Sequence, residues 1–167
     1  MRVLCCLDGT NSEQLSQAVS AFMKSVEGGT LAIGLLYVTD SGPQRDMDLR
    51  RGRSFAPRLT GPLRREQMRE SEQFAAQDIL EEGKRYFSHV EGVEALQRAG
   101  RPEREIVNAA AAWNADIIVV CPRSINRGAP PLGPKSVGHV ARFVLDHAPC
   151  PVLLVRPVTR SSFPLPG

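Results

Sequence analysis

The fold is decided by the stretch that begins Ala115-Asp-Ile-Ile-Val-Val-Cys121 and ends Gly138-His-Val-Ala-Arg-Phe-Val-Leu-Asp-His-Ala-Pro-Cys-Pro-Val152. The first part is an apolar run typical of a buried strand, and the second predicts a helix followed by another strand. Between them lies a loop rich in glycine, proline and basic residues. In open α/β sheets, a strand, a loop and a helix in this order form the place where nucleotides bind.

The rest of the chain repeats the same alternation. Apolar runs predict strands over residues 2–7, 31–38, 93–99 and 152–156. Helical spacing of apolar residues predicts helices between Thr10 and Gly28, from about 63 to 87, and from 103 to 113. The order is strand, helix, strand, helix, strand, helix, strand, helix, strand. It predicts an α/β fold with a five-stranded parallel, doubly wound sheet and right-handed crossovers.

Two finer predictions concern the helices. The sequence Thr10-Asn-Ser-Glu13 has the spacing of a capping box, which predicts that the Thr10 hydroxyl caps the first helix. In the second helix the residues predicted to face inward are Met68, Ala75, Ile79 and Tyr86.

The composition favours one globular domain. Of 167 residues, 42% are hydrophobic and 23% are charged, which is enough to bury a core. No apolar run approaches the roughly 20 residues that a membrane span needs, and the first residues lack a signal-peptide pattern. We therefore expect a cytoplasmic protein without a membrane partner.

The four cysteines fit a reducing compartment, because Cys5, Cys6, Cys121 and Cys150 show no disulfide framework. We expect buried packing residues. The alternative is a redox pair of Cys6 and Cys121, since both follow strands that end at the same edge of the sheet.

The net charge of +3 is concentrated in one segment. Residues 45–65 hold seven arginines and two aspartates, a net +5, so the remainder is about −2. Without a sustained period, residues 41–62 are predicted to form a flexible insertion, and residues 158–167 a loose tail. The segment from Arg45 to Arg65 is a candidate surface for a protein partner. Nucleic acid is disfavoured because the chain has no helix-turn-helix or RNA-binding signature.

Five matching pieces make the chain resemble the universal stress protein family. They are Val3–Thr10, Leu35–Val38, Gly100–Ile106, Ala115–Val119 and Gly138–Val152, in the right order over about 155 residues. The resemblance implies a domain over residues 1–157 with the strand order 3-2-1-4-5, as in adenine nucleotide alpha hydrolase-like folds. It also implies a homodimer in which the last strand, Pro151 to Arg156, pairs with its counterpart in the other subunit.

The resemblance further implies a nucleotide site, with ATP or another adenine nucleotide and Mg, although the cofactor is absent in some relatives. Asp8 and Val38 match the positions that hold the adenosine part. The phosphate motif Gly-x-x-Gly-x9-Gly-Ser/Thr is degraded: its first two glycines fall on Cys121 and Ser124, Gly138 fills the third, and His139 replaces the hydroxyl residue. Counting all registers, the candidate binding residues are Asp8, Val38, Cys121, Arg123, Ser124, Gly128, Gly138, His139 and Val140.

Three functions are compatible with these observations. The first is a stress-response module that senses a small anionic ligand or binds a partner, with altered or absent ATP binding. The second is an ordinary ATP-binding stress protein with weak ATP hydrolysis, although the chain has no Walker lysine motif and no catalytic residue can be assigned. The third is a partner-binding module that uses Arg45 to Arg65. Three scattered histidines do not predict a metal site.

Overall fold

The computed structural model describes residues 1–24, 30–40, 62–122 and 137–156. Its centre is a sheet of five parallel strands in the order β3-β2-β1-β4-β5. The strands are β1 (Arg2–Leu7), β2 (Ala32–Asp40), β3 (Val93–Gly100), β4 (Ile117–Val120) and β5 (Val152–Leu154). The predicted fold class and strand order are confirmed.

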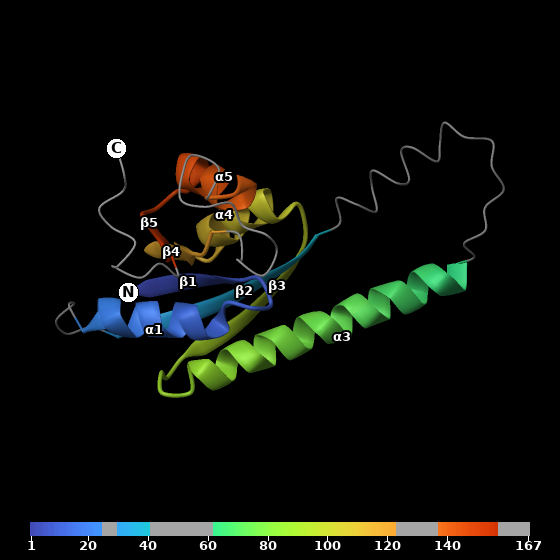
Figure 1. Ribbon diagram of the computed structural model, residues 1–167, viewed down its shortest axis with the longest axis horizontal. Helices are drawn as coiled ribbons and strands as arrows, with labels where there is room; N and C mark the ends of the chain where they lie inside the picture. Colours follow the sequence, from blue (N-terminus) through green and yellow to red (C-terminus); the bar gives the residue numbers. More distant parts are fainter. Residues whose placement is uncertain (25–29, 41–61, 123–136, 157–167) are drawn as a thin grey trace, which may run out of the picture.

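Helices cover both faces of this sheet (Figure 1). They are α1 (Ser12–Met23), α3 (Pro62–Tyr86), α4 (Pro102–Ala112) and α5 (His139–His147). One core cluster packs α1 and α3 against the sheet and contains Leu15, Val19, Leu80 and Phe87. The other packs α4 and α5 against the opposite face and contains Ile106, Ala110, Ala141 and Val144. The sheet is therefore doubly wound, with α1 and α3 in one layer and α4 and α5 in the other.

The central strand β1 supplies side chains to both clusters. Val3, Cys5 and Leu7 lie on the α1/α3 face, and Leu4 and Cys6 lie on the α4/α5 face. All five are buried. A near-continuous apolar run is what a strand needs when both of its faces are covered.

The predicted inward face of α3 is wrong by one position. The buried residues are Ala76, Leu80, Gly83 and the following Phe87, whereas Met68, Ala75 and Tyr86 are exposed. Of the predicted residues, Ile79 is half-buried and packs against the core. The helix packs closely against the sheet at Gly83, where an added Cβ would lie 2.9 Å from Leu7 Cδ1. Small residues let α3 approach the sheet, but they carry no hydrophobic signal in the sequence.

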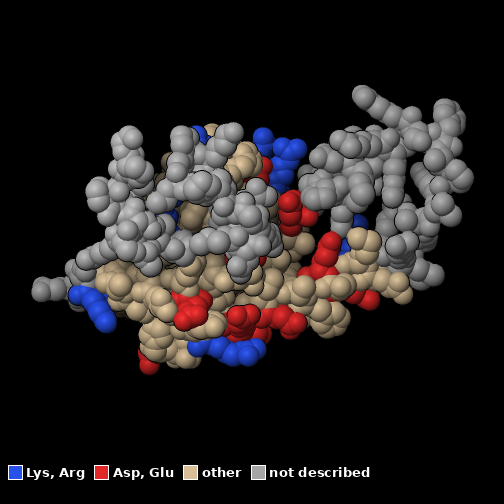
Figure 2. Space-filling model, in the orientation of Figure 1, with Lys and Arg blue, Asp and Glu red and all other residues tan. Residues whose placement is uncertain are grey.

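The outer surface of the α1/α3 layer is charged (Figure 2). On α3 the Lys84 ammonium lies 2.8 Å from Glu81 Oε1. This contact lowers the pKa of the Glu81 carboxyl, through the hydrogen bond first and the charge of Lys84 second. Among the helices that the structure describes, none is long and apolar enough to cross a membrane.

Several predictions fall outside the described residues. They are the insertion at 41–62 except for Pro62, which begins α3, the end of the first helix near Gly28, and the tail at 158–167. The candidate residues Arg123, Ser124 and Gly128 also lie outside the described ranges.

Candidate functional site

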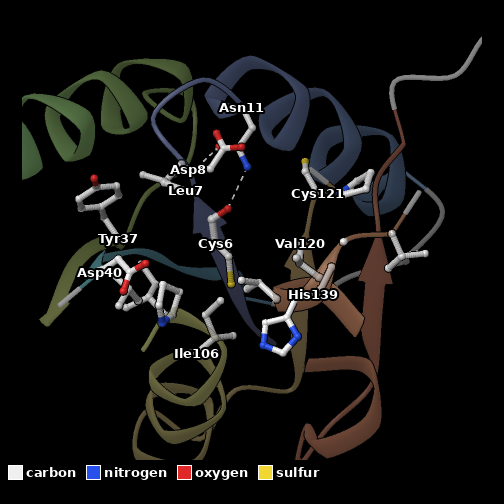
Figure 3. A pocket seen from close by; sticks show the side chains of 18 residues that line it. Cys6, Leu7, Asp8, Asn11, Tyr37, Asp40, Ile106, Val120, Cys121 and His139 are labelled. Carbon is white, nitrogen blue, oxygen red and sulfur yellow. Dashed lines mark hydrogen bonds between the residues drawn. The ribbon is translucent and has the colours of Figure 1, made fainter. Parts of the chain in front are cut away.

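A cleft of about 530 Å³ opens at the carboxyl ends of β1, β2 and β4 (Figure 3). It lies next to the boundary between β1 and β4, where the strand order changes direction: β1 is followed by β2 on one side, and β3 is followed by β4 on the other. This is the switch point at which open α/β sheets bind ligands. The N-termini of α4 and α5 also border it, through Pro102 and Gly138. Its volume falls within the range of small-molecule sites.

The predicted residues that the structure describes all line this cleft. They are Asp8, Val38, Cys121, Gly138, His139 and Val140. Three strand ends and one helix N-terminus bring them together from positions up to 132 apart in the sequence. Their ligand-binding roles stay predictions, but their common location follows from the strand order.

Asp8 forms the turn from β1 into α1. Its Oδ1 accepts hydrogen bonds from the backbone N–H of Thr10 at 2.8 Å and from the Thr10 hydroxyl at 2.9 Å. Such a turn fixes the direction of the carboxylate. Within the described part of the chain, Oδ2 accepts no hydrogen bond and is available to a ligand donor.

The predicted capping box is absent because the Thr10 hydroxyl is engaged by Asp8 rather than by α1. The N-cap residue of α1 is Asn11, which makes no side-chain capping hydrogen bond. Ser12 and Glu13 begin the helix, and the two-way hydrogen bonding of a capping box is not formed. The backbone carbonyl of Asn11 accepts the N–H of Leu15 at 3.0 Å.

Asn11 is the residue that the sequence reasoning missed. It is 4% exposed and lines the cleft. Its Oδ1 accepts the backbone N–H of Asp8 at 3.0 Å, and its Nδ2 donates to the carbonyl of Cys6 at 3.0 Å (Figure 3). The side chain thus links the end of β1 to the start of α1. The sequence does contain a signal for this role. The apolar run of β1 is followed by Asp-Gly-Thr-Asn, and asparagine side chains favour such local hydrogen bonds to the backbone.

The cysteines of the cleft are packing residues. Cys6 belongs to the core cluster on the α4/α5 side, whereas Cys121 packs on the α1/α3 side with Cys5. The register explains this, since Cys5 pairs with Val119 and Cys121 lies two residues further along the same face. The proposed redox pair of Cys6 and Cys121 therefore loses its geometric basis.

Burial also keeps these thiols protonated. It raises the pKa of Cys5 to about 12 and that of Cys121 to about 11, where a hydrogen bond from Asn11 offsets part of the effect. Burial raises the pKa of Cys6 as well. Because the thiolate is the reactive form, these cysteines are unreactive near neutral pH.

The N-terminus of α5 forms the other end of the cleft. Its N-cap, Gly138, has φ 80° and ψ 163°, a conformation that is essentially restricted to glycine. His139 follows as the first helical residue and is exposed. Its Nε2 lies 3.7 Å from Glu103 Oε1 in the first turn of α4. Backbone N–H groups at such a terminus can bind an anion.

Substituting Gly138 by alanine is expected to cost about 2 kcal/mol of unfolding free energy, because a Cβ is strained at this φ and ψ. Urea denaturation measures the loss. Gly92→Ala is the matched control, since Gly92 also has φ 80° and precedes β3 at the opposite edge of the sheet. Both variants should lose stability, and only Gly138→Ala should alter ligand binding in the cleft. If Gly138→Ala were as stable as the wild-type protein, a Cβ would not be strained at this position.

Comparisons with known proteins agree with this fold. Solved structures that are similar to the chain include universal stress protein UspA from Lactobacillus plantarum, with 20% identity, 93% of this chain and 97% of that chain covered, and a TM-score of 0.64. A universal stress protein family protein from Arabidopsis thaliana with AMP bound has 19% identity, coverage of 99% and 96%, and a TM-score of 0.57. A universal stress protein in complex with cAMP has 18% identity, coverage of 95% and 98%, and a TM-score of 0.55.

At these identities the structural matches establish the shared fold. A search of curated proteins found no matching sequence. The sequence model of the universal stress protein family matches residues 1–156, which is nearly the whole chain. The protein belongs to the universal stress protein family.

Proposed function

We propose that the protein is a stress-response module that binds an adenine nucleotide in the carboxyl-edge cleft and senses it, or transmits its presence to a partner, with an altered phosphate site. The observation that carries this proposal is the placement of Asp8 and the N-terminus of α5 around one cleft of about 530 Å³. Structural relatives with AMP or cAMP bound support an adenine nucleotide as the ligand.

The adenosine part fits the side of the cleft formed by β1, β2 and α4. Leu36, Val38 and Ile106 give this side an apolar wall, against which a purine ring or a ribose can pack. Asp8 lines the same cleft, and its Oδ2 atom is an acceptor for a ribose hydroxyl or an adenine N–H. Asp8 is the residue on which we expect adenosine affinity to depend most.

The phosphate part lies towards α5, and here the cleft differs from a polyphosphate cradle. Cys121 carries a side chain where the family motif has a glycine, so the backbone is less accessible to phosphate oxygens. Asp8 adds negative charge to the lining. Each further phosphate group would increase the electrostatic repulsion. We therefore propose that AMP and cyclic AMP bind at least as tightly as ATP, and that ATP hydrolysis is not the function.

Calorimetric titration with AMP, ADP, Mg-ATP and cyclic AMP tests this proposal. Asp8→Ala is expected to weaken binding of every nucleotide by at least about tenfold, because a charge-assisted hydrogen bond is lost. Asp8→Asn keeps an acceptor for the Thr10 bonds and isolates the effect of the charge. The matched control is Asp146→Asn on the exposed surface of α5. A folded wild-type protein that bound none of the four nucleotides would overturn the proposal and direct attention to protein partners.

We also propose a cytoplasmic homodimer formed through β5. This strand is an edge of the sheet, hydrogen-bonded within the described chain to β4, and its residues Val152–Leu154 are only half-buried. Pairing with a second copy would protect such an edge. The free cysteines support a reducing compartment. Sedimentation velocity of the purified protein distinguishes the dimer from a monomer or a tetramer.

A further inference from the structure

The strand β3 leaves one edge of the sheet open. Among the described residues, β3 is hydrogen-bonded to β2 and to no other strand (Figure 1). It has eight residues, whereas β5 at the opposite edge has only three. Its exposed side chains are those of Glu94, Ala95, Gln97, Arg98 and Ala99. A long open edge presents a row of backbone N–H and C=O groups with which a further strand can pair.

The register with β2 determines which backbone groups of β3 face outward. Ile33 is paired with Val93, and its N–H donates to the carbonyl of Gly92 at 3.3 Å. In a parallel ladder the backbone groups of successive residues point to opposite sides of the strand. The even-numbered residues of β3 therefore bond β2, and the odd-numbered residues face the open side. These outward-facing residues are Val93, Ala95, Gln97 and Ala99.

The charges along this edge are arranged in opposite order on the two sides of Leu96. Glu94 lies two residues before Leu96, and Arg98 lies two residues after it. Further out, Glu91 lies five residues before Leu96, and Arg101 lies five residues after it. All four charged side chains are exposed. An antiparallel copy of the same strand, centred on Leu96, would therefore place each glutamate opposite an arginine.

We propose that β3 pairs antiparallel with β3 of a second copy of the chain, about a two-fold axis at Leu96. In this register the outward-facing residues lie opposite one another, for example Ala95 opposite the partner's Gln97, so their N–H and C=O groups can all pair. Glu94 and the partner's Arg98 fall at the intervening positions, where facing side chains lie closest. The two-fold axis forms this ion pair twice.

Neighbouring registers lack one of these two features. A shift by one residue would place outward-facing groups opposite residues that already bond β2. A shift by two residues would keep the backbone pairing but would no longer place Glu94 opposite the partner's Arg98. Charged residues on an edge strand usually oppose pairing. Here the backbone and the charges agree on a single self-complementary register.

The side chains that would form the interface are available for it. Over the ranges that the structure describes, Arg98 has no ion-pair partner. Glu94 accepts the indole N–H of Trp113 through Oε2 at 2.7 Å, which leaves Oε1 for an arginine. Leu96 is half-buried and packs against the core on the α4/α5 face. Its remaining surface would contact the partner's Leu96 at the axis.

This interface is separate from the proposed pairing through β5, because β3 and β5 are opposite edges of the sheet. A copy that paired at both edges would belong to an assembly larger than a dimer. The inference does not depend on nucleotide binding in the cleft.

Charge reversal tests the register. Arg98→Glu and Glu94→Arg are each expected to weaken association through β3 by about tenfold or more, because each places like charges opposite one another. A mixture of the two variants should regain the association, since every facing pair is then again a glutamate and an arginine. Arg69→Glu is the matched control: Arg69 is exposed on α3, and its reversal changes the net charge equally. Sedimentation velocity over a range of protein concentrations measures these changes.

Amide hydrogen exchange identifies the edge that pairs. The N–H groups of Ala95, Gln97 and Ala99 are expected to become protected as the protein concentration rises, and Arg98→Glu should abolish this protection. The N–H groups of Leu96 and Arg98 point to β2, so they should be protected at every concentration. Pairing through β5 would not change the exchange of the odd-numbered amides of β3.

The outcomes decide for or against this interface alone. If the amides of Ala95, Gln97 and Ala99 exchanged equally fast at all concentrations, β3 would not pair with a second copy. If the mixture of Arg98→Glu and Glu94→Arg associated no better than either variant alone, the proposed register would be wrong. An assembly that Arg98→Glu left unchanged in size would likewise overturn the inference. Each of these results would leave nucleotide binding, which calorimetry measures on the same protein, unaffected.

Discussion

The Phe87→Ala protein is expected to lose about 4 kcal/mol of unfolding free energy. The Phe87 ring is fully buried, and it packs in the α1/α3 core cluster with Leu15 and Leu80. It follows the last turn of α3, where its N–H donates to the carbonyl of Gly83. Truncation would leave a cavity between α3 and the sheet that the rigid surroundings cannot fill. Chemical denaturation measures the loss as a lower midpoint with an unchanged slope.

Tyr86→Ala is the matched control one residue earlier. The Tyr86 side chain is 40% exposed, and its contact with α1 is made by the backbone carbonyl, which accepts the Ser16 hydroxyl at 2.8 Å. Alanine keeps that carbonyl, so the expected loss is within about 0.5 to 1 kcal/mol. Equal losses in the two variants would mean that α3 is rotated and buries the face predicted from the sequence.

The strands could be predicted from the sequence because buried parallel strands give continuous apolar runs. Their order could be predicted only from the family resemblance, since alternation of strands and helices allows several orders. The lengths were less well predicted. β4 was expected over 115–121 and spans Ile117–Val120, because Ala115 bonds back to the last turn of α4 through the carbonyl of Ala110.

The helix faces show the limit of apolar periodicity. In α3, Ile79 and Tyr86 produce a helical stripe in the sequence, yet Ala76 and Gly83 are on the buried face, and the helix lies close to the sheet at Gly83. A glycine in this position contributes no hydrophobicity, but it allows the helix to approach Leu7, which a side chain would obstruct. Such a preference depends on the shape of the opposite surface, which the local sequence does not contain.

The sequence predicts at which edge of the sheet the candidate site lies. Asp8 and Val38 end neighbouring parallel strands, and Gly138 opens the helix that precedes β5, so topology alone brings them to one cleft. The contact between Glu103 and His139 was not predictable, because it joins two helix N-termini that are 36 residues apart in the sequence. Neither helix has a local sequence pattern that predicts contact with the other helix.

Asn11→Ala is expected to lose about 3 kcal/mol of unfolding free energy, because it removes two hydrogen bonds to the backbone, one buried and one part-buried. The backbone groups are the N–H of Asp8 and the carbonyl of Cys6, which the Asn11 amide now bonds at 3.0 Å each. The same change should weaken cyclic AMP binding by about tenfold, since Asp8 loses the bond that fixes its backbone. Denaturation and calorimetry on one preparation measure both effects.

Thr10→Val is the matched control, because it removes one hydroxyl from the same turn and keeps the side-chain shape. Thr10 is exposed, and its backbone N–H still donates to Asp8 Oδ1 at 2.8 Å. The expected stability loss is therefore below about 1 kcal/mol, and nucleotide affinity should change little. If Thr10→Val cost as much as Asn11→Ala, the hydroxyl bond and not the buried amide would hold the turn. If Asn11→Ala lost stability but kept full affinity, Asp8 would not need the amide to face the ligand, and the link between the stability of the turn and binding would be broken.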